Sequence, residues 1–97
     1  MVELSVMGKA IQVSGHGSED EPFILHGIKG NTPLAAAAEH AMIDNWMGPG
    51  NWDLLKTRLE RPGNGQVLAV LTVLTNDENG QSIKGDIWFN IAEAYDI

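Results

Sequence analysis

The first third of the chain alternates apolar and polar positions. Apolar side chains recur at every second residue on either side of Gly8: Val2, Leu4, Val6, Ile11 and Val13. Alternation with a period of two predicts β-structure, here one bent strand or a short hairpin. The polar, glycine-bearing residues 15–22 predict an exposed loop, and residues 23–28 predict a further strand.

The clearest helix signal covers residues 32–47. Asn31 offers a capping side chain, and Pro33 has the fixed φ and the missing N–H that suit a first helical turn. The four alanines that follow Leu34 have high helix propensity, and Gly48-Pro49-Gly50 ends the pattern. The alanines make the apolar face of this helix thin, so the helix can lie close to a sheet.

Three extended segments follow, over residues 52–60, 66–75 and 82–95, separated by two turn sequences rich in Gly and Asn. The composition of 52–60 also suits a helix, but nine residues between glycine-proline breaks would form few internal hydrogen bonds, which favours a strand. The chain is therefore predicted to be one α+β domain over residues 1–97. Its N-terminal strands lie within 2–28, its helix at 32–47 and a three-stranded meander within 52–95. The expected architecture has two layers, an antiparallel sheet on one main helix, in the order ββαβββ.

The turn lengths predict which side chains share a face of this sheet. A two-residue turn at Asn79-Gly80 would place Leu71 opposite Trp88, and the preceding turn would place Leu59 opposite Leu68. One face, with Leu68 on it, would then lie under the helix. The second face would also be apolar and forms the candidate interface or ligand site: Trp52, Leu54, Val67, Ala69, Leu71, Val73 and Trp88.

This second face is too apolar to be left in water, and three coverings are possible. The N-terminal strands could fold over it, a second copy could pack on it, or it could bind a ligand or another protein. Charged residues that would share the face suit the rim of a protein interface: Lys56, Arg58, Glu60 and Asp86.

Composition narrows the function classes. The 97 residues include no cysteine, which excludes disulfide scaffolds, Cys-based metal sites and cysteine nucleophiles. A formal charge of −7, with six Lys+Arg against thirteen Asp+Glu, argues against binding along a phosphate backbone. Without a long apolar run or a signal-peptide pattern, we expect a cytoplasmic protein that does not contact membranes.

No catalytic, metal or cofactor site is predicted. His16 lies near three acidic residues without a recognised metal spacing, and His26 is expected to be a hydrogen-bonded structural residue. His40 and Asp44 are one helical turn apart and could orient an imidazole or form a surface pair. No nucleotide-binding glycine motif is present. Trp46 is expected to pack at the edge of the core.

Four short motifs occur in an order that resembles small uncharacterised bacterial proteins. They are the Gly-Ser-acidic stretch Gly17–Phe23, the helical Ala38-Glu39-His40, the turn Gly48–Trp52 and the late strand residues Phe89-Asn90-Ile91. Asn90 stands where an acidic residue is expected. The resemblance implies one small α+β unit and no activity.

The leading hypothesis is a non-enzymatic interaction protein, a homodimer that uses the second sheet face or binds another protein there. One alternative is a small-molecule binding protein with an apolar or aromatic pocket. Another is an acidic inhibitor or nucleic-acid mimic, which would require the carboxylates of two loops to converge on one surface: Glu19, Asp20, Glu21, Asp77 and Glu78.

Overall fold

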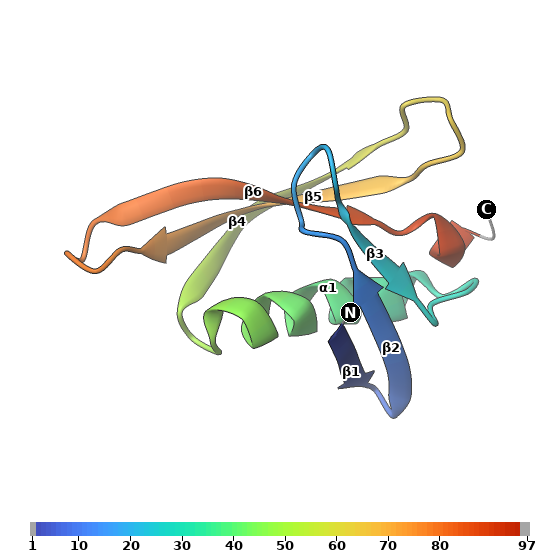
Figure 1. The fold of residues 1–97 in the computed structure, drawn as a ribbon, viewed down its shortest axis with the longest axis horizontal. Helices are drawn as coiled ribbons and strands as arrows, with labels where there is room; N and C mark the ends of the chain where they lie inside the picture. Colours follow the sequence, from blue (N-terminus) through green and yellow to red (C-terminus); the bar gives the residue numbers. More distant parts are fainter. Residues whose placement is uncertain (1, 96–97) are drawn as a thin grey trace.

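The chain forms one six-stranded sheet with a helix against one face (Figure 1). The computed structural model describes residues 2–95. The elements are β1 (Val2–Val6), β2 (Lys9–Ser14), β3 (Phe23–His26), α1 (Thr32–Met47), β4 (Trp52–Glu60), β5 (Leu68–Asn76), β6 (Ser82–Asn90) and the 3₁₀ helix η1 (Ala92–Tyr95). The predicted α+β class is confirmed. The order is βββαβββ instead of the predicted ββαβββ, because the chain turns at Met7 and Gly8 and the first segment forms a hairpin of two strands, β1 and β2. No helix among the described residues has the length and apolar character needed to cross a membrane.

Helix α1 begins and ends where its capping residues indicate. The Asn31 Oδ1 accepts a hydrogen bond of 3.0 Å from the Leu34 N–H, and Pro33 lies in the first turn. At the other end the Gly48 N–H donates to the Asp44 carbonyl at 2.8 Å. Gly48 has a φ of 91°, a conformation that glycine adopts easily and residues with a side chain rarely adopt. This positive φ ends the helix at Gly48.

The strand order is β1-β2-β3-β6-β5-β4, and the sheet is mixed rather than antiparallel throughout. β3 pairs with β6 in parallel, with Phe23 opposite Phe89. The predicted all-antiparallel sheet is therefore wrong at this one pair. Between β3 and β6 the chain passes through α1, β4 and β5, and this long crossover allows β6 to run in the same direction as β3.

The turn between β5 and β6 sets the register of the meander, and it differs from the expected turn. The Asp77 N–H donates to the Gln81 carbonyl at 2.8 Å, whereas the expected turn would pair Glu78 with Gln81, so three residues form the tip. The Asp77 carboxylate closes the turn by accepting from the Asn79 and Gln81 N–H groups. One extra residue moves the pairing by one position, so Trp88 lies opposite Val70.

A similar shift occurs at β4, where Leu59 pairs with Ala69 instead of Leu68. The pairing is irregular between Leu54 and Lys56, which marks a β-bulge. Both shifts turn the side chains of β5 toward the opposite faces from those predicted. The odd-numbered residues of β5 therefore face the helix.

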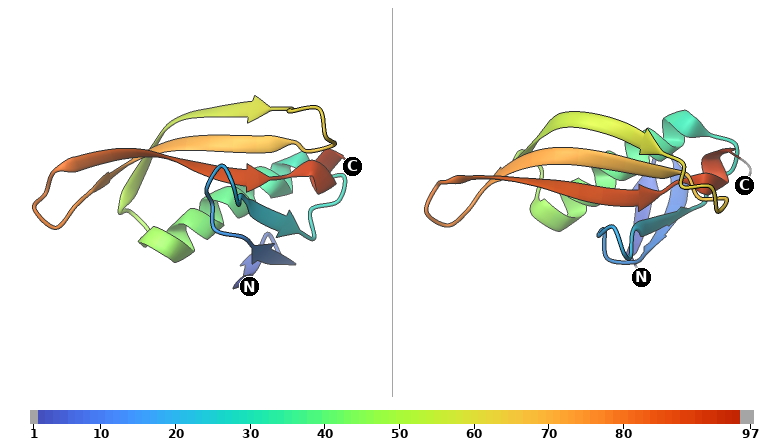
Figure 2. Two further views of the ribbon diagram at one scale, coloured as in Figure 1. Left: turned by 45° about the horizontal axis from the view of Figure 1, so that its top comes forward. Right: turned by 90° about the horizontal axis from the view of Figure 1, so that it is seen from above.

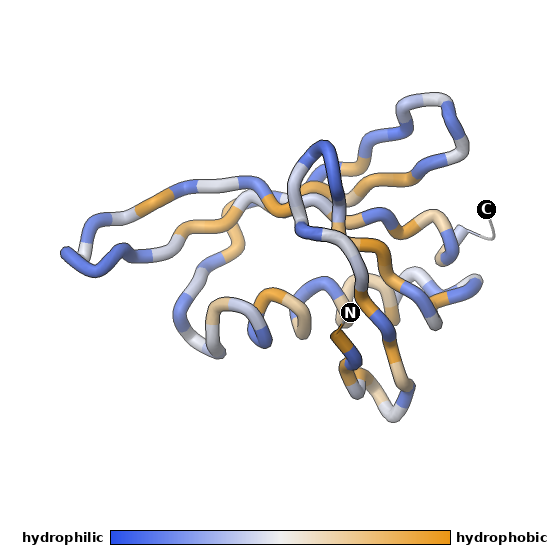
Figure 3. The backbone as a smooth tube through the Cα atoms, in the orientation of Figure 1, coloured by the Kyte–Doolittle hydropathy of each residue, from blue (hydrophilic) through white to orange (hydrophobic). Residues whose placement is uncertain are grey.

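The main core lies between α1 and the inner face of the sheet. It combines residues of the helix, of β5 and β6, and of the N-terminal strands. The sheet curves so that β1, at one edge, also contacts α1 (Figure 2). Hydrophobic segments of β5 and β6 lie above the helix in this view and those of β1 and β2 lie beside and below it, whereas the β5–β6 turn is hydrophilic (Figure 3). A second, small cluster of Leu68, Val70 and Trp88 forms on the outer face.

Candidate interaction surface

Four of the predicted interface residues belong to the main core and are not on an open face. They are 0 to 2% exposed: Val67, Ala69, Leu71 and Val73. The expectation of a second copy or ligand on these side chains is corrected, because the helix and the N-terminal strands cover them within one chain. Trp52 is half-buried against the same core, Leu54 lies exposed on β4, and Trp88 is on the opposite face.

The outer face is closed by its own side chains. The Arg58 guanidinium lies 5.5 Å from the centre of the Trp88 ring, a cation–π distance. Its Nε donates to Glu60 at 2.8 Å, and its Nη2 lies 3.6 Å from Asp86. The hydrogen bond to Glu60 is the main cause that raises the pKa of Arg58. Trp88 is therefore only 8% exposed, which leaves little apolar surface for a partner.

The strand β4 forms the more open surface. It is nine residues long, lies at the edge of the sheet and pairs only with β5. Three of its leucines are exposed: Leu54 by 39%, Leu55 by 49% and Leu59 by 50%. An unpaired edge of this kind presents backbone N–H and C=O groups as a template for another strand. We call the segment Lys56–Arg61, which begins after the bulge, the β4 edge.

A pocket of about 430 Å³ lies where the end of α1 meets β4 and β5. Its lining includes both apolar and polar side chains: Met47, Gly50, Asn51, Trp52, Asp53, Leu74, Thr75 and Asn76. The Trp52 Nε1 donates to the Asp44 Oδ1 at 2.8 Å, which fixes the indole at the pocket wall. The His40 ring meets the Trp52 ring edge-on at 5.6 Å. His40 and Asp44 thus both support this tryptophan.

The other two histidines each have one acidic neighbour. The His16 Nε2 lies 3.0 Å from Glu21, and the His26 Nδ1 lies 3.9 Å from Glu93. Within residues 2–95 no cluster of three or more metal-ligating side chains occurs. Each pair is a single contact between an imidazole and a carboxylate, and the His16–Glu21 pair is exposed to solvent.

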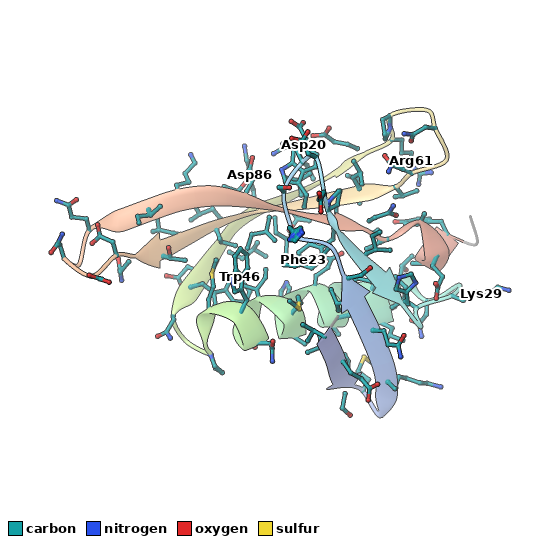
Figure 4. All side chains as sticks on the ribbon, viewed as in Figure 1. Asp20, Phe23, Lys29, Trp46, Arg61 and Asp86 are labelled. Carbon is teal, nitrogen blue, oxygen red and sulfur yellow. The ribbon has the colours of Figure 1, made fainter. Side chains whose placement is uncertain are left out.

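Trp46 packs at the rim of the core and remains 54% exposed. Its ring meets the Phe23 ring edge-on at 5.7 Å, and both side chains lie between α1 and the sheet (Figure 4). The same view shows Asp20 on the loop before β3. The acidic β5–β6 turn lies apart from that loop in all three ribbon views. The charge-mimic alternative therefore lacks the single acidic surface it requires.

Two acidic residues have structural roles that no sequence motif indicates. Glu39 is only 5% exposed on the sheet-facing side of α1, and burial raises its pKa from 4.5 to about 7. Glu39 lies one helical turn from both Ala35 and Ile43, and this spacing indicates that it shares their buried face. The Glu93 Oε1 accepts from the Gly27 and Ile28 N–H groups at 2.7 and 2.9 Å, and no local pattern indicates that long-range contact.

Comparisons of the chain with protein-family models, with curated proteins and with solved structures find no match. The functional inference therefore depends on the geometry of this chain. Among the surfaces described above, the β4 edge combines unpaired backbone with the half-exposed Leu59 and is the strongest candidate for contact with a partner.

Proposed function

We propose that this protein is a small, non-enzymatic interaction protein that forms a homodimer through the edge strand β4. The observation that carries the proposal is the open edge of β4 after its bulge, where Leu59 is 50% exposed. At about 3.4 Å per residue, residues 57–61 offer about 17 Å of backbone for pairing. The opposite edge, β1, has five residues and contacts the helix.

Strand addition would satisfy the outward backbone groups of the β4 edge and remove Leu59 from water at the same time. A second copy is the occupant that the Arg58–Glu60 pair favours. These two opposite charges lie 2.8 Å apart on the β4 edge, so an antiparallel copy can place each of them beside the opposite charge of the other chain.

The contact would be small, since it involves one strand from each copy. Interfaces of limited area are typical of weak or transient complexes, so the proposed dimer forms at micromolar to millimolar protein concentration. This concentration dependence is the property that an experiment can test.

Sedimentation velocity over that range is the direct test. The wild type should shift toward the mass of a dimer as concentration rises, and Leu59→Lys should stay monomeric. Ile83→Lys is the matched control, because Ile83 on β6 is also 50% exposed but lies away from β4. A wild type that remains monomeric at millimolar concentration would refute the proposal.

A second candidate is small-molecule binding, which the pocket beside Trp52 favours. Its volume of about 430 Å³ is within the range of ligand sites, and its mixed lining suits a small polar molecule with an apolar part. Screening of small fragments by NMR tests this candidate. Binding should perturb the amide signals of Asn51 and Thr75 together, and a screen without such shifts contradicts it.

The cytoplasmic location and the absence of enzymatic activity stay predictions from the sequence.

A further inference from the structure

We infer that the two copies pair antiparallel about a two-fold axis at Leu59, so that Arg58 of each copy faces Glu60 of the other. The inference rests on the proposed self-association through β4, and it specifies the register of that contact. Two six-stranded sheets would then continue as one sheet across the dimer.

Symmetry restricts the possible registers. When two identical antiparallel strands are related by an axis perpendicular to the sheet, one residue lies opposite its own copy at the centre. The neighbours of that residue then pair in reciprocal fashion. Each residue of β4 therefore defines one possible register, in which that residue lies at the centre. The registers can be compared by the side chains that each one places opposite one another.

The bulge removes the registers in the first half of the strand. Pairing with β5 is irregular between Leu54 and Lys56, so the outer edge is not a regular strand at Leu55. A register centred on Thr57 would need that part of the strand, because it pairs Leu55 with Leu59. It would also place Lys56 opposite Arg58 twice, and like charges opposite one another destabilise a sheet.

Repulsion between like charges also excludes most of the remaining registers in the second half of β4. Registers at Lys56, Arg58 or Glu60 would each place a charged side chain opposite its own copy. The register centred on Leu59 has no such conflict. It uses residues 57–61, which lie entirely after the bulge, and Pro62 then ends the pairing because it has no N–H to donate.

The side chains in this register are complementary on both faces. Leu59 meets its own copy beside the inner face, where half of its surface is now exposed. On the outer face Arg58 and Glu60, already joined at 2.8 Å within one chain, would alternate with the same pair of the second copy. The four charges would form a closed ring of opposite neighbours, which favours this partner and this register.

Cysteine cross-linking tests the register, and the chain is suited to it because it contains no native cysteine. Leu59→Cys should form a disulfide-linked dimer under mild oxidation, since residues directly opposite in an antiparallel pair have close Cβ atoms. Thr57→Cys is the matched variant two residues away, and Ile83→Cys measures random collision at equal exposure. We expect Leu59→Cys to cross-link about tenfold faster than either control.

The outcomes separate this inference from the proposed function. Faster cross-linking at Thr57, or equal rates at all three positions while sedimentation still detects a dimer, would overturn the register and leave self-association standing. A wild type that is monomeric in sedimentation, with all three variants cross-linking at the collision rate, would overturn both.

Discussion

Replacing the buried Glu39 by glutamine should make the protein more stable at neutral and alkaline pH. The Glu39 side chain is 5% exposed, and no ion pair holds its carboxylate among residues 2–95. Burial without a compensating charge disfavours ionisation and raises its pKa from 4.5 to about 7. Glutamine has nearly the same shape and cannot ionise, so it removes the cost without opening a cavity.

The folded and unfolded states lose the Glu39 proton at different pH values, and this difference determines how the free energy of unfolding changes with pH. In the unfolded chain Glu39 ionises near pH 4.5, while in the folded protein it keeps its proton up to about pH 7. Between these values the folded state binds more protons, so stability falls as pH rises. At about 1.4 kcal/mol for each pH unit, the full cost is about 3 kcal/mol above pH 7 and disappears below pH 4.5.

Urea unfolding of wild type and Glu39→Gln at several pH values measures this cost. The variant should be more stable by about 3 kcal/mol at about pH 8 and by about 1 kcal/mol at about pH 5. Glu78→Gln in the exposed β5–β6 turn is the control for the loss of one negative charge. If the difference between Glu39→Gln and wild type does not change with pH, the assignment of Glu39 as a buried, protonated group is wrong.

Three further predictions concern stability and are checked by the same unfolding assay. Glu93→Ala should cost about 1 to 3 kcal/mol, because it leaves two backbone N–H groups near the start of α1 without their acceptor. Gly15→Ala should destabilise the protein more than Gly63→Ala. Both glycines have positive φ, but only at Gly15 would the new Cβ collide with backbone. Equal losses in the free energy of unfolding would contradict this prediction. Trp52→Phe should cost about 1 to 2 kcal/mol through loss of its hydrogen bond to Asp44, and an unchanged midpoint would contradict that contribution.

Local chemistry made the elements of this fold predictable. Asn31, Pro33 and Gly48 fix the ends of α1 through backbone contacts within a few residues, and the helix occupies 32–47 as expected. The same holds for β4, where the alternative of a short helix is wrong because the segment pairs with β5 along its length. Such signals act over short distances, and a single sequence contains them.

The faces of the sheet depend on details that the sequence pattern does not determine. The tip of the β5–β6 turn has three residues instead of two because the Asp77 carboxylate binds two N–H groups across it. That one residue moves Val67 and Leu71 from a predicted open face into the core. Successive side chains of a strand point to opposite faces, so a shift of one residue in a meander exchanges the two faces of the strand.

The candidate interface lies elsewhere than predicted because of the same shift in pairing. The sequence correctly placed Lys56, Arg58, Glu60 and Asp86 on the face that carries Trp88, and the ion pairs among them agree with that placement. It did not indicate that β4 would lie at the edge, because strand order depends on the parallel pairing of β3 with β6. That pairing joins residues more than sixty positions apart.

Amide hydrogen exchange at two protein concentrations tests the central claim most directly. If β4 pairs with a second copy, the outward-facing amides of residues 57–61 should exchange more slowly at millimolar than at micromolar concentration, while those of β1 should not change. Equal exchange in β4 at both concentrations, or new protection at β1 instead, would contradict self-association through the β4 edge.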